Sequence, residues 1–398
     1  MTSTKNIAVV IEYKPQLDGL RFCAVLFVLI YHYLPVFREL NGTLDLALFL
    51  VFFFVLSSYL VTKILLISKE KGIAAGHSKS KIGLVFLIRR TLRIFPAYYF
   101  YLILLLLLPY AGQNVKDNAL SYFLYYSNFQ LFYTHEWGEL TPHLWTLAVE
   151  EQFYLVWPWI ILFTPDKHLT KVFYFFIALG ILSRAVLFAL MKSPELEFAT
   201  LQVLTPTCID AFSLGALLAY RHVQGKTSNP VFFWLVLLSI PIMIYNKISH
   251  QVYFIFFERT FVALMAVVVV EGANRGYKNF IGSFLQHKVV VYLAKISYGM
   301  YLYHIFVAYL FWKVISIINN YATHQLHLDL SKIINFLAIP LVSFFIYFAL
   351  SVVMAVLSWH FLEKPISNLK RRFIYNSPNK VNLTPAEPKS VNEVKALS

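Results

Sequence analysis

The chain has 398 residues, of which 59% are hydrophobic and only 14% are charged. A soluble domain is typically about 45–50% apolar and about 25% charged, so this apolar surplus exceeds what one buried core holds and predicts lipid contact. The formal net charge of +14 comes from Lys and Arg residues that lie between apolar runs. That distribution is typical of membrane-protein loops and excludes nucleic acid as the expected partner.

A membrane-spanning helix needs roughly 20 mostly apolar residues. The pattern therefore predicts an all-α, polytopic membrane protein with ten spanning helices at about 20–38, 44–66, 92–110, 145–164, 171–191, 206–221, 231–246, 252–271, 292–316 and 333–361. The aromatic segment 119–134 is short and polar, so we expect a re-entrant or interfacial piece there rather than another span.

Lys and Arg residues set the expected orientation of these helices. With the N-terminus inside, most of the 34 Lys and Arg residues fall in inner segments, which predicts that both termini are cytoplasmic. We expect a cytoplasmic N-terminal segment at 1–16, one transmembrane domain at 17–368 and a disordered cytoplasmic tail at 369–398. The two cysteines, Cys23 and Cys208, lie in apolar runs and indicate no disulfide framework.

Ionisable residues inside spans are costly and indicate function by default. The first helix carries Asp18, Arg21 and His32. Eleven residues at about 1.5 Å each place His32 roughly 16 Å beyond Arg21, so Arg21 is expected near the cytoplasmic surface and His32 near the middle of the bilayer. A histidine at that depth is a candidate general base, although a His bonded to a backbone carbonyl would also fit.

The third helix begins with a basic cluster, Arg89, Arg90 and Arg93. Arg90 and Arg93 share one helix face because they are three residues apart. The cluster fits either an ordinary positive anchor at the inner surface or a guanidinium clamp for phosphate groups.

Two adjacent acids, Glu150 and Glu151, lie within the fourth predicted helix. They point about 100° apart, so one is expected to face the interior and one a neighbouring helix. A structural alternative is that they pair with an intramembrane arginine, Arg184 or Arg259.

The ninth predicted helix places Ser297, Tyr301 and His304 on one stripe, with His304 again near mid-bilayer. Asp210 and Ser57 are weaker candidates that would also serve as polar contacts between helices. The twelve histidines show no metal-ligand spacing, so no metal is expected. Together these residues indicate a polar path, which fits an enzyme or a transporter.

The ordered set of these motifs resembles the acyltransferase-3 family of membrane O-acyltransferases over about residues 16–368. The resemblance is carried by Leu17 to Arg21 with His32, Phe52 to Ser57, Arg90 to Arg93 with Pro96, His143 to Tyr154 with Pro158, Ser297 to His304, and Glu363 to Pro365. Two departures are Ser58, where the family usually has Gly, and Thr146, where Ser is usual. The match corresponds to the family's membrane module.

The resemblance implies acyl transfer from acetyl-CoA or another short acyl-CoA to a hydroxyl of a glycan, in a bacterial inner or plasma membrane. It implies catalytic roles for His32, Arg21, Glu150, Glu151, His304 and Tyr301, and acyl-CoA binding by Arg89, Arg90 and Arg93. Weaker site candidates are Asp18, Ser57, His143, Thr146, Tyr154, Asp210 and Ser297. The alternative is a transporter or flippase for a lipid-linked glycan, which would predict inverted repeats with broken helices; no such symmetry is visible.

Overall fold

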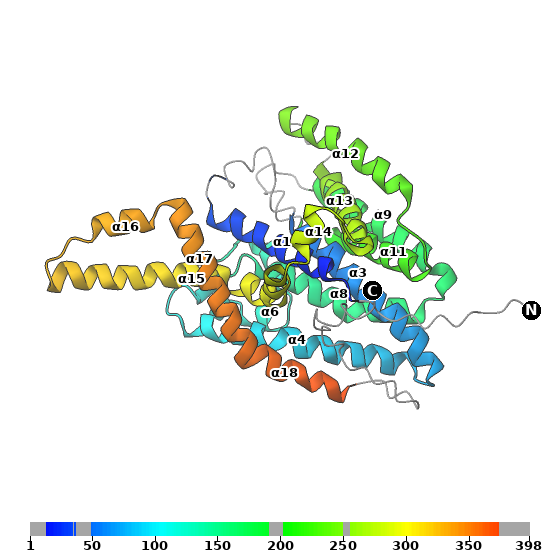
Figure 1. Cartoon of the computed structure of the whole chain (residues 1–398), viewed down its shortest axis with the longest axis horizontal. Coiled ribbons are helices and arrows are strands. Elements are labelled where there is room, and N and C mark those ends of the chain that lie inside the picture. The colour runs from blue at the N-terminus through cyan, green and yellow to red at the C-terminus, as the bar shows by residue number, and fades with distance from the viewer. Residues whose placement is uncertain (1–12, 35, 37–48, 191–201, 250–254, 374–398) are drawn as a thin grey trace, which may run out of the picture.

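The computed structural model describes residues 13–34, 36, 49–190, 202–249 and 255–373. Every regular element in these ranges is a helix (Figure 1). The longer helices are α1 (Pro15–Tyr33), α3 (Phe49–Ala74), α4 (Lys79–Leu107), α8 (Leu144–Phe163), α9 (Asp166–Leu190), α11 (Thr205–Val223), α12 (Pro230–Ser249), α13 (Ile255–Arg275), α15 (Lys288–Gln325) and α17 (Pro340–Ser358). The shorter ones are α5 (Gln113–Asp117), α6 (Ala119–Phe123), α7 (Ser127–Thr134), α14 (Phe280–Leu285), α16 (Ser331–Leu337) and α18 (Lys364–Asn368).

Five helical stretches are long and apolar enough to cross a membrane, judged by length and composition within the described ranges. They are Leu50–Ala74, Lys79–Leu107, Asp166–Leu190, Lys288–Gln325 and Pro340–Arg372. Helices also occupy most of the described residues of the other predicted spans, and residues 35, 37–38, 44–48, 191 and 252–254 of the ten predicted spans lie outside the described ranges. The number of ten spans and the cytoplasmic termini stay predictions. The segment 119–134 forms two helices, α6 and α7, each too short to span; whether it is re-entrant stays a prediction.

The last predicted span, 333–361, is wrong as a single helix. The chain leaves α16 after Leu337 and starts α17 at Pro340. Proline has no N–H to donate and is suited to the first turn of a helix, which explains the break. After α17 the chain continues as a π-helix, Trp359–Glu363. Glu363, its last residue, is buried.

Helix α15 is longer than the predicted span 292–316. It has 38 residues, which corresponds to about 57 Å at 1.5 Å per residue. That length exceeds the roughly 30 Å hydrocarbon core of a bilayer. Figure 1 shows its C-terminal half, with α16, extending well beyond the other helices.

Close backbone contacts fix the helices that surround the site. A Cβ on Gly215 of α11 would lie 2.2 Å from the Val55 carbonyl oxygen of α3. A Cβ on Gly19 of α1 would lie 2.2 Å from the Leu285 carbonyl oxygen at the end of α14. Only glycine permits these approaches without a backbone shift, so α1 and α3 are held tightly against their neighbours.

The buried apolar side chains form two clusters. One joins residues of α3, α8, α9, α11 and α13, and the other joins residues of α4, α8, α15 and α17, with α1 contributing to both. Leu50, Phe95 and Tyr298 pack against both clusters. The residues that line the cavity described next come from α1, α3, α4, α8 and α15, so the cavity lies where the two clusters meet.

Candidate active site

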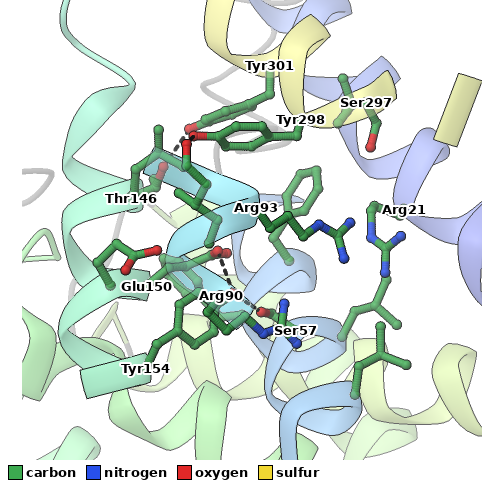
Figure 2. A pocket seen from close by; sticks show the side chains of 18 of the residues that line it. Arg21, Ser57, Arg90, Arg93, Thr146, Glu150, Tyr154, Ser297, Tyr298 and Tyr301 are labelled. Carbon is green, nitrogen blue, oxygen red and sulfur yellow. Dashed lines mark hydrogen bonds between the residues drawn. The ribbon is translucent and has the colours of Figure 1, made fainter. Parts of the chain in front are cut away.

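A cavity of about 290 Å³ lies between α1, α3, α4, α8 and α15. Its apolar lining includes Phe53, Phe54, Leu60 and Ile64. Its polar lining gathers most of the side chains that the sequence singled out, namely Asp18, Arg21, Ser57, Arg90, Arg93, Thr146, Glu150, Glu151, Tyr154, Ser297 and Tyr301 (Figure 2). Residues up to about 280 positions apart in the chain therefore line one partly apolar cavity.

Three arginines contribute to this cavity. Arg21 binds Asp18, one helical turn earlier, with 2.8 Å between Nη1 and Oδ1. Arg90 and Arg93, by contrast, form no ion pair with any residue in the described ranges. Their guanidinium groups line the cavity without a carboxylate at ion-pair distance, and the expectation that they share one face of α4 is confirmed.

The third member of the sequence cluster, Arg89, lies elsewhere. Its side chain is exposed and does not line the cavity. The helical rotation of about 100° per residue separates it from Arg90. Of the three arginines in the predicted phosphate clamp, the structure brings only Arg90 and Arg93 to the cavity.

A hydrogen-bonded chain of three side chains runs along the cavity wall. The Tyr154 hydroxyl donates to Oε2 of Glu150 at 2.9 Å, and the Ser57 hydroxyl lies 2.5 Å from the Tyr154 hydroxyl. Figure 2 shows both bonds, beside Arg90. The guanidinium carbon of Arg90 is 5.2 Å from the centre of the Tyr154 ring, within the range of a cation–π contact.

Thr146 and Tyr301 bind each other at the other end of the cavity. Their hydroxyl oxygens are 2.6 Å apart, and the Tyr301 hydroxyl also donates to the His143 carbonyl at 3.0 Å. Both residues line the cavity. This pair is the wall between the cavity and a group of histidines.

His32, His143 and His304 form that group. The ring centres of His32 and His143 each lie 4.9 Å from that of His304. His143 and His304 are buried, and none of the three lines the cavity. The sequence placed Ser297, Tyr301 and His304 on one stripe, and the structure divides that stripe at Tyr301.

The backbone fixes the tautomers of two of these rings. Nε2 of His143 lies 3.0 Å from the Leu302 carbonyl, and Nδ1 of His304 lies 2.6 Å from the Tyr301 carbonyl, so each of these nitrogens donates a proton. The remaining nitrogens, Nδ1 of His143 and Nε2 of His304, are buried without a hydrogen-bond partner among the described residues. Both therefore offer a lone pair.

Asp210 lies apart from the cavity and the histidines. Arg184 of α9 binds it with two parallel bonds of 2.9 and 2.8 Å, and Thr260 of α13 donates to it at 2.6 Å. The Arg184–Asp210 pair is fully buried and joins α9 to α11, and the bond from Thr260 adds α13. Arg184 is thus engaged by Asp210, which removes it as the partner expected for Glu150 or Glu151.

The site also contains a residue that the sequence did not single out. Tyr298 lines the cavity and donates to the Ile94 carbonyl of α4 at 3.0 Å, which ties α15 to the arginine helix. Tyr298 lies inside the motif from Ser297 to His304, which was the signal that could have found it. No group of three or more His, Cys, Asp or Glu side chains in the described part of the chain, the three histidines included, has an arrangement that could hold a metal ion.

Comparison with known proteins assigns the chain that contains this site to a family. The acyltransferase-3 profile, described as an acyltransferase domain, matches residues 14–360. The chain belongs to the acyltransferase-3 family. The match includes every residue that lines the cavity and all three histidines.

Named relatives in this family are similar at low identity. Peptidoglycan O-acetyltransferase OatA of Listeria monocytogenes is 29% identical over 320 residues, which cover 74% of this chain and 49% of the relative. Putative O-acetyltransferase SAS0844 of Staphylococcus aureus is 28% identical, with 89% and 57% covered, and putative peptidoglycan O-acetyltransferase YrhL of Bacillus subtilis is 28% identical, with 89% and 55% covered. The chain thus spans about half the length of these relatives. No solved structure matches it.

Proposed function

We propose that this chain is a membrane-bound O-acyltransferase that moves an acetyl or other short acyl group from acyl-CoA to a hydroxyl of a carbohydrate. The observation that carries the proposal is the convergence of Arg90, Arg93, Glu150 and Tyr154 in one partly apolar cavity. Family membership and the names of the relatives support the same reaction class. The acceptor that best fits those names is a cell-envelope glycan.

The arginines provide the donor site in this proposal. Guanidinium groups bind phosphate oxygens through forked, charge-assisted hydrogen bonds. Ligand pockets usually measure about 300–1,000 Å³, so a cavity of about 290 Å³ takes the acyl-pantetheine arm and leaves the nucleotide outside it. The arginines are expected to face the cytoplasm, where acyl-CoA is made, with both chain termini on that side of a bacterial plasma membrane.

The histidine group provides the base. His32 accepts the proton of the acceptor hydroxyl in this proposal, a role typically worth about 100- to 10,000-fold in rate. His304 and His143, with lone pairs directed away from the backbone carbonyls they bind, orient His32 or pass its proton onward. In this proposal the Tyr301 hydroxyl turns its proton from the His143 carbonyl to the developing oxyanion.

The test is acyl transfer by the purified chain in liposomes. Free thiol released from acetyl-CoA would be measured with a panel of glycan acceptors, for the wild type and His32→Ala. Acceptor-dependent release that His32→Ala loses supports the proposal, and intact turnover in that variant contradicts the role of His32. No release with any donor, together with transbilayer movement of a labelled lipid-linked glycan, would favour the transporter instead.

A further inference from the structure

Two adjacent serines of α3 have different surroundings. Ser58 is fully buried and donates to the Phe212 carbonyl of α11. Ser57 is only partly buried, lines the cavity and has its hydroxyl 2.5 Å from that of Tyr154. The Ser58 hydroxyl therefore joins α3 to α11, and the Ser57 hydroxyl faces the cavity that the arginines line.

Counting protons gives the Ser57–Tyr154 bond a direction. A tyrosine hydroxyl has one proton, and that of Tyr154 is donated to Glu150. With Glu150 ionised, the oxygen of Tyr154 acts as acceptor toward Ser57, so the Ser57 hydroxyl is the donor. The three side chains form an ordered path along which a proton leaves Ser57 toward a carboxylate.

This arrangement matches the general design of an activated hydroxyl nucleophile. Such a nucleophile is within hydrogen-bond reach of a proton acceptor, which a third group orients. Here Tyr154 is the acceptor, Glu150 is the orienting carboxylate, and Arg90 lies over the Tyr154 ring at 5.2 Å, where its charge favours negative charge on the phenol oxygen. The proposed base His32 does not line the cavity, so Tyr154 and through it Glu150, and not His32, are within hydrogen-bond reach of the Ser57 hydroxyl.

The cavity also suits a covalent ester. Phe53, Phe54, Leu60 and Ile64 contribute apolar surface beside Ser57. Such surface excludes water, which would otherwise hydrolyse an acylated serine. The ester would be held between the arginines and the Thr146–Tyr301 wall, with the histidines beyond that wall.

We propose that Ser57 carries the acyl group as an ester between donor and acceptor, an inference that rests on the proposed function. The Ser57 oxygen attacks the thioester carbon, the C–O bond forms and the C–S bond breaks. The Ser57 proton passes to Tyr154 as the Tyr154 proton passes to Glu150, and the departing CoA thiolate takes a proton from water to become the thiol, a proton that His32 returns to water after the second step. The acceptor hydroxyl next attacks the ester carbon, its proton leaves to His32, and Ser57 regains a proton from Tyr154, which Glu150 reprotonates.

The experiment traps this ester on the whole chain in liposomes. The wild type, Ser57→Ala and Ser58→Ala would receive radiolabelled acetyl-CoA without any acceptor, followed by acid quench and peptide mass spectrometry. We expect acetyl on the Ser57 peptide of the wild type and of Ser58→Ala, and none on Ser57→Ala. Labelling of Tyr154→Phe should be about 100-fold slower because the proton path is cut.

A second measurement separates the ester from a structural role of Ser57. Ser57→Ala should retain the affinity of the wild type for desulfo-CoA while its turnover with acceptor falls at least about 100-fold. Ser57→Cys should regain labelling as a thioester that hydroxylamine cleaves. Ser58→Ala, which loses a buried helix contact and no cavity group, controls for folding.

Three results would overturn the inference. If the wild type transfers acetyl to an acceptor but Ser57 is never labelled, transfer is direct. That result refutes the role of Ser57 as carrier and leaves the proposed function intact. If the label is found on another residue, the carrier is that residue. If the wild type releases no CoA with any acceptor, the proposed function falls together with the carrier.

Discussion

The sharpest test of the donor site compares three arginines of one helix. Arg90 and Arg93 line the cavity without an ion-pair partner in the described ranges, whereas Arg89 is exposed outside it. A hydrogen bond to a charged group contributes about 1.5–3 kcal/mol, and each 1.4 kcal/mol is tenfold in affinity. Arg93→Gln and Arg90→Gln should each weaken CoA binding about 10- to 150-fold, while Arg89→Gln, a solvent-screened surface charge, should change it less than about fivefold.

The assay is equilibrium binding of CoA to the purified chain in nanodiscs, so that chemistry does not enter the measurement. Glutamine keeps a polar amide and the first two methylene groups of the arginine side chain and removes its charge. Arg21→Gln should have an intermediate effect because Asp18 already compensates the Arg21 charge. An effect of Arg89→Gln as large as that of Arg93→Gln, or no effect of either, would refute the assignment of the cavity as the donor site.

The remaining predictions concern residues away from the arginines. Asp210→Ala leaves Arg184 buried without its carboxylate and should destabilise the chain by about 3–5 kcal/mol, seen as a lower unfolding temperature with unchanged CoA affinity. His32→Ala should lower kcat about 100- to 10,000-fold without changing CoA affinity, because His32 does not line the cavity. Tyr301→Phe removes the hydroxyl bound to Thr146 and should lower kcat by about tenfold or more, while circular dichroism stays that of the wild type.

The helices and the arginine face were predictable because both follow from local periodicity. Apolar runs of about 20 residues located the long helices, and the three-residue spacing of Arg90 and Arg93 placed them on one face. The break before Pro340 was also visible in principle, since a proline inside an apolar run often starts a new helix. The prediction failed there because hydropathy averages over a window and does not register a single missing N–H group.

Relations between distant helices could not be predicted in the same way. The Arg184–Asp210 pair joins α9 to α11, and the bond of Tyr154 to Ser57 joins α8 to α3. Spacing along the chain carries no information about which helix lies opposite, so Arg184 was equally available to Glu150. The predicted depth of an ionisable residue in the membrane indicated only that it is paired or functional. It did not indicate which residue is its partner.

The position of Tyr301 connects these observations to the reaction. Its hydroxyl binds Thr146 and the His143 carbonyl, so it closes the cavity toward the side where His32 and His304 lie. A donor held by the arginines and an acceptor deprotonated by His32 are therefore on opposite sides of one hydrogen-bonded pair. Direct transfer requires that this pair open while both substrates are bound, whereas an acyl ester on Ser57 lets CoA leave first. The second route divides the reaction into two steps. The first uses Ser57, Tyr154 and Glu150 within the cavity, and the second requires the Tyr301 pair to open, after CoA has left, so that His32 can take the proton of the acceptor.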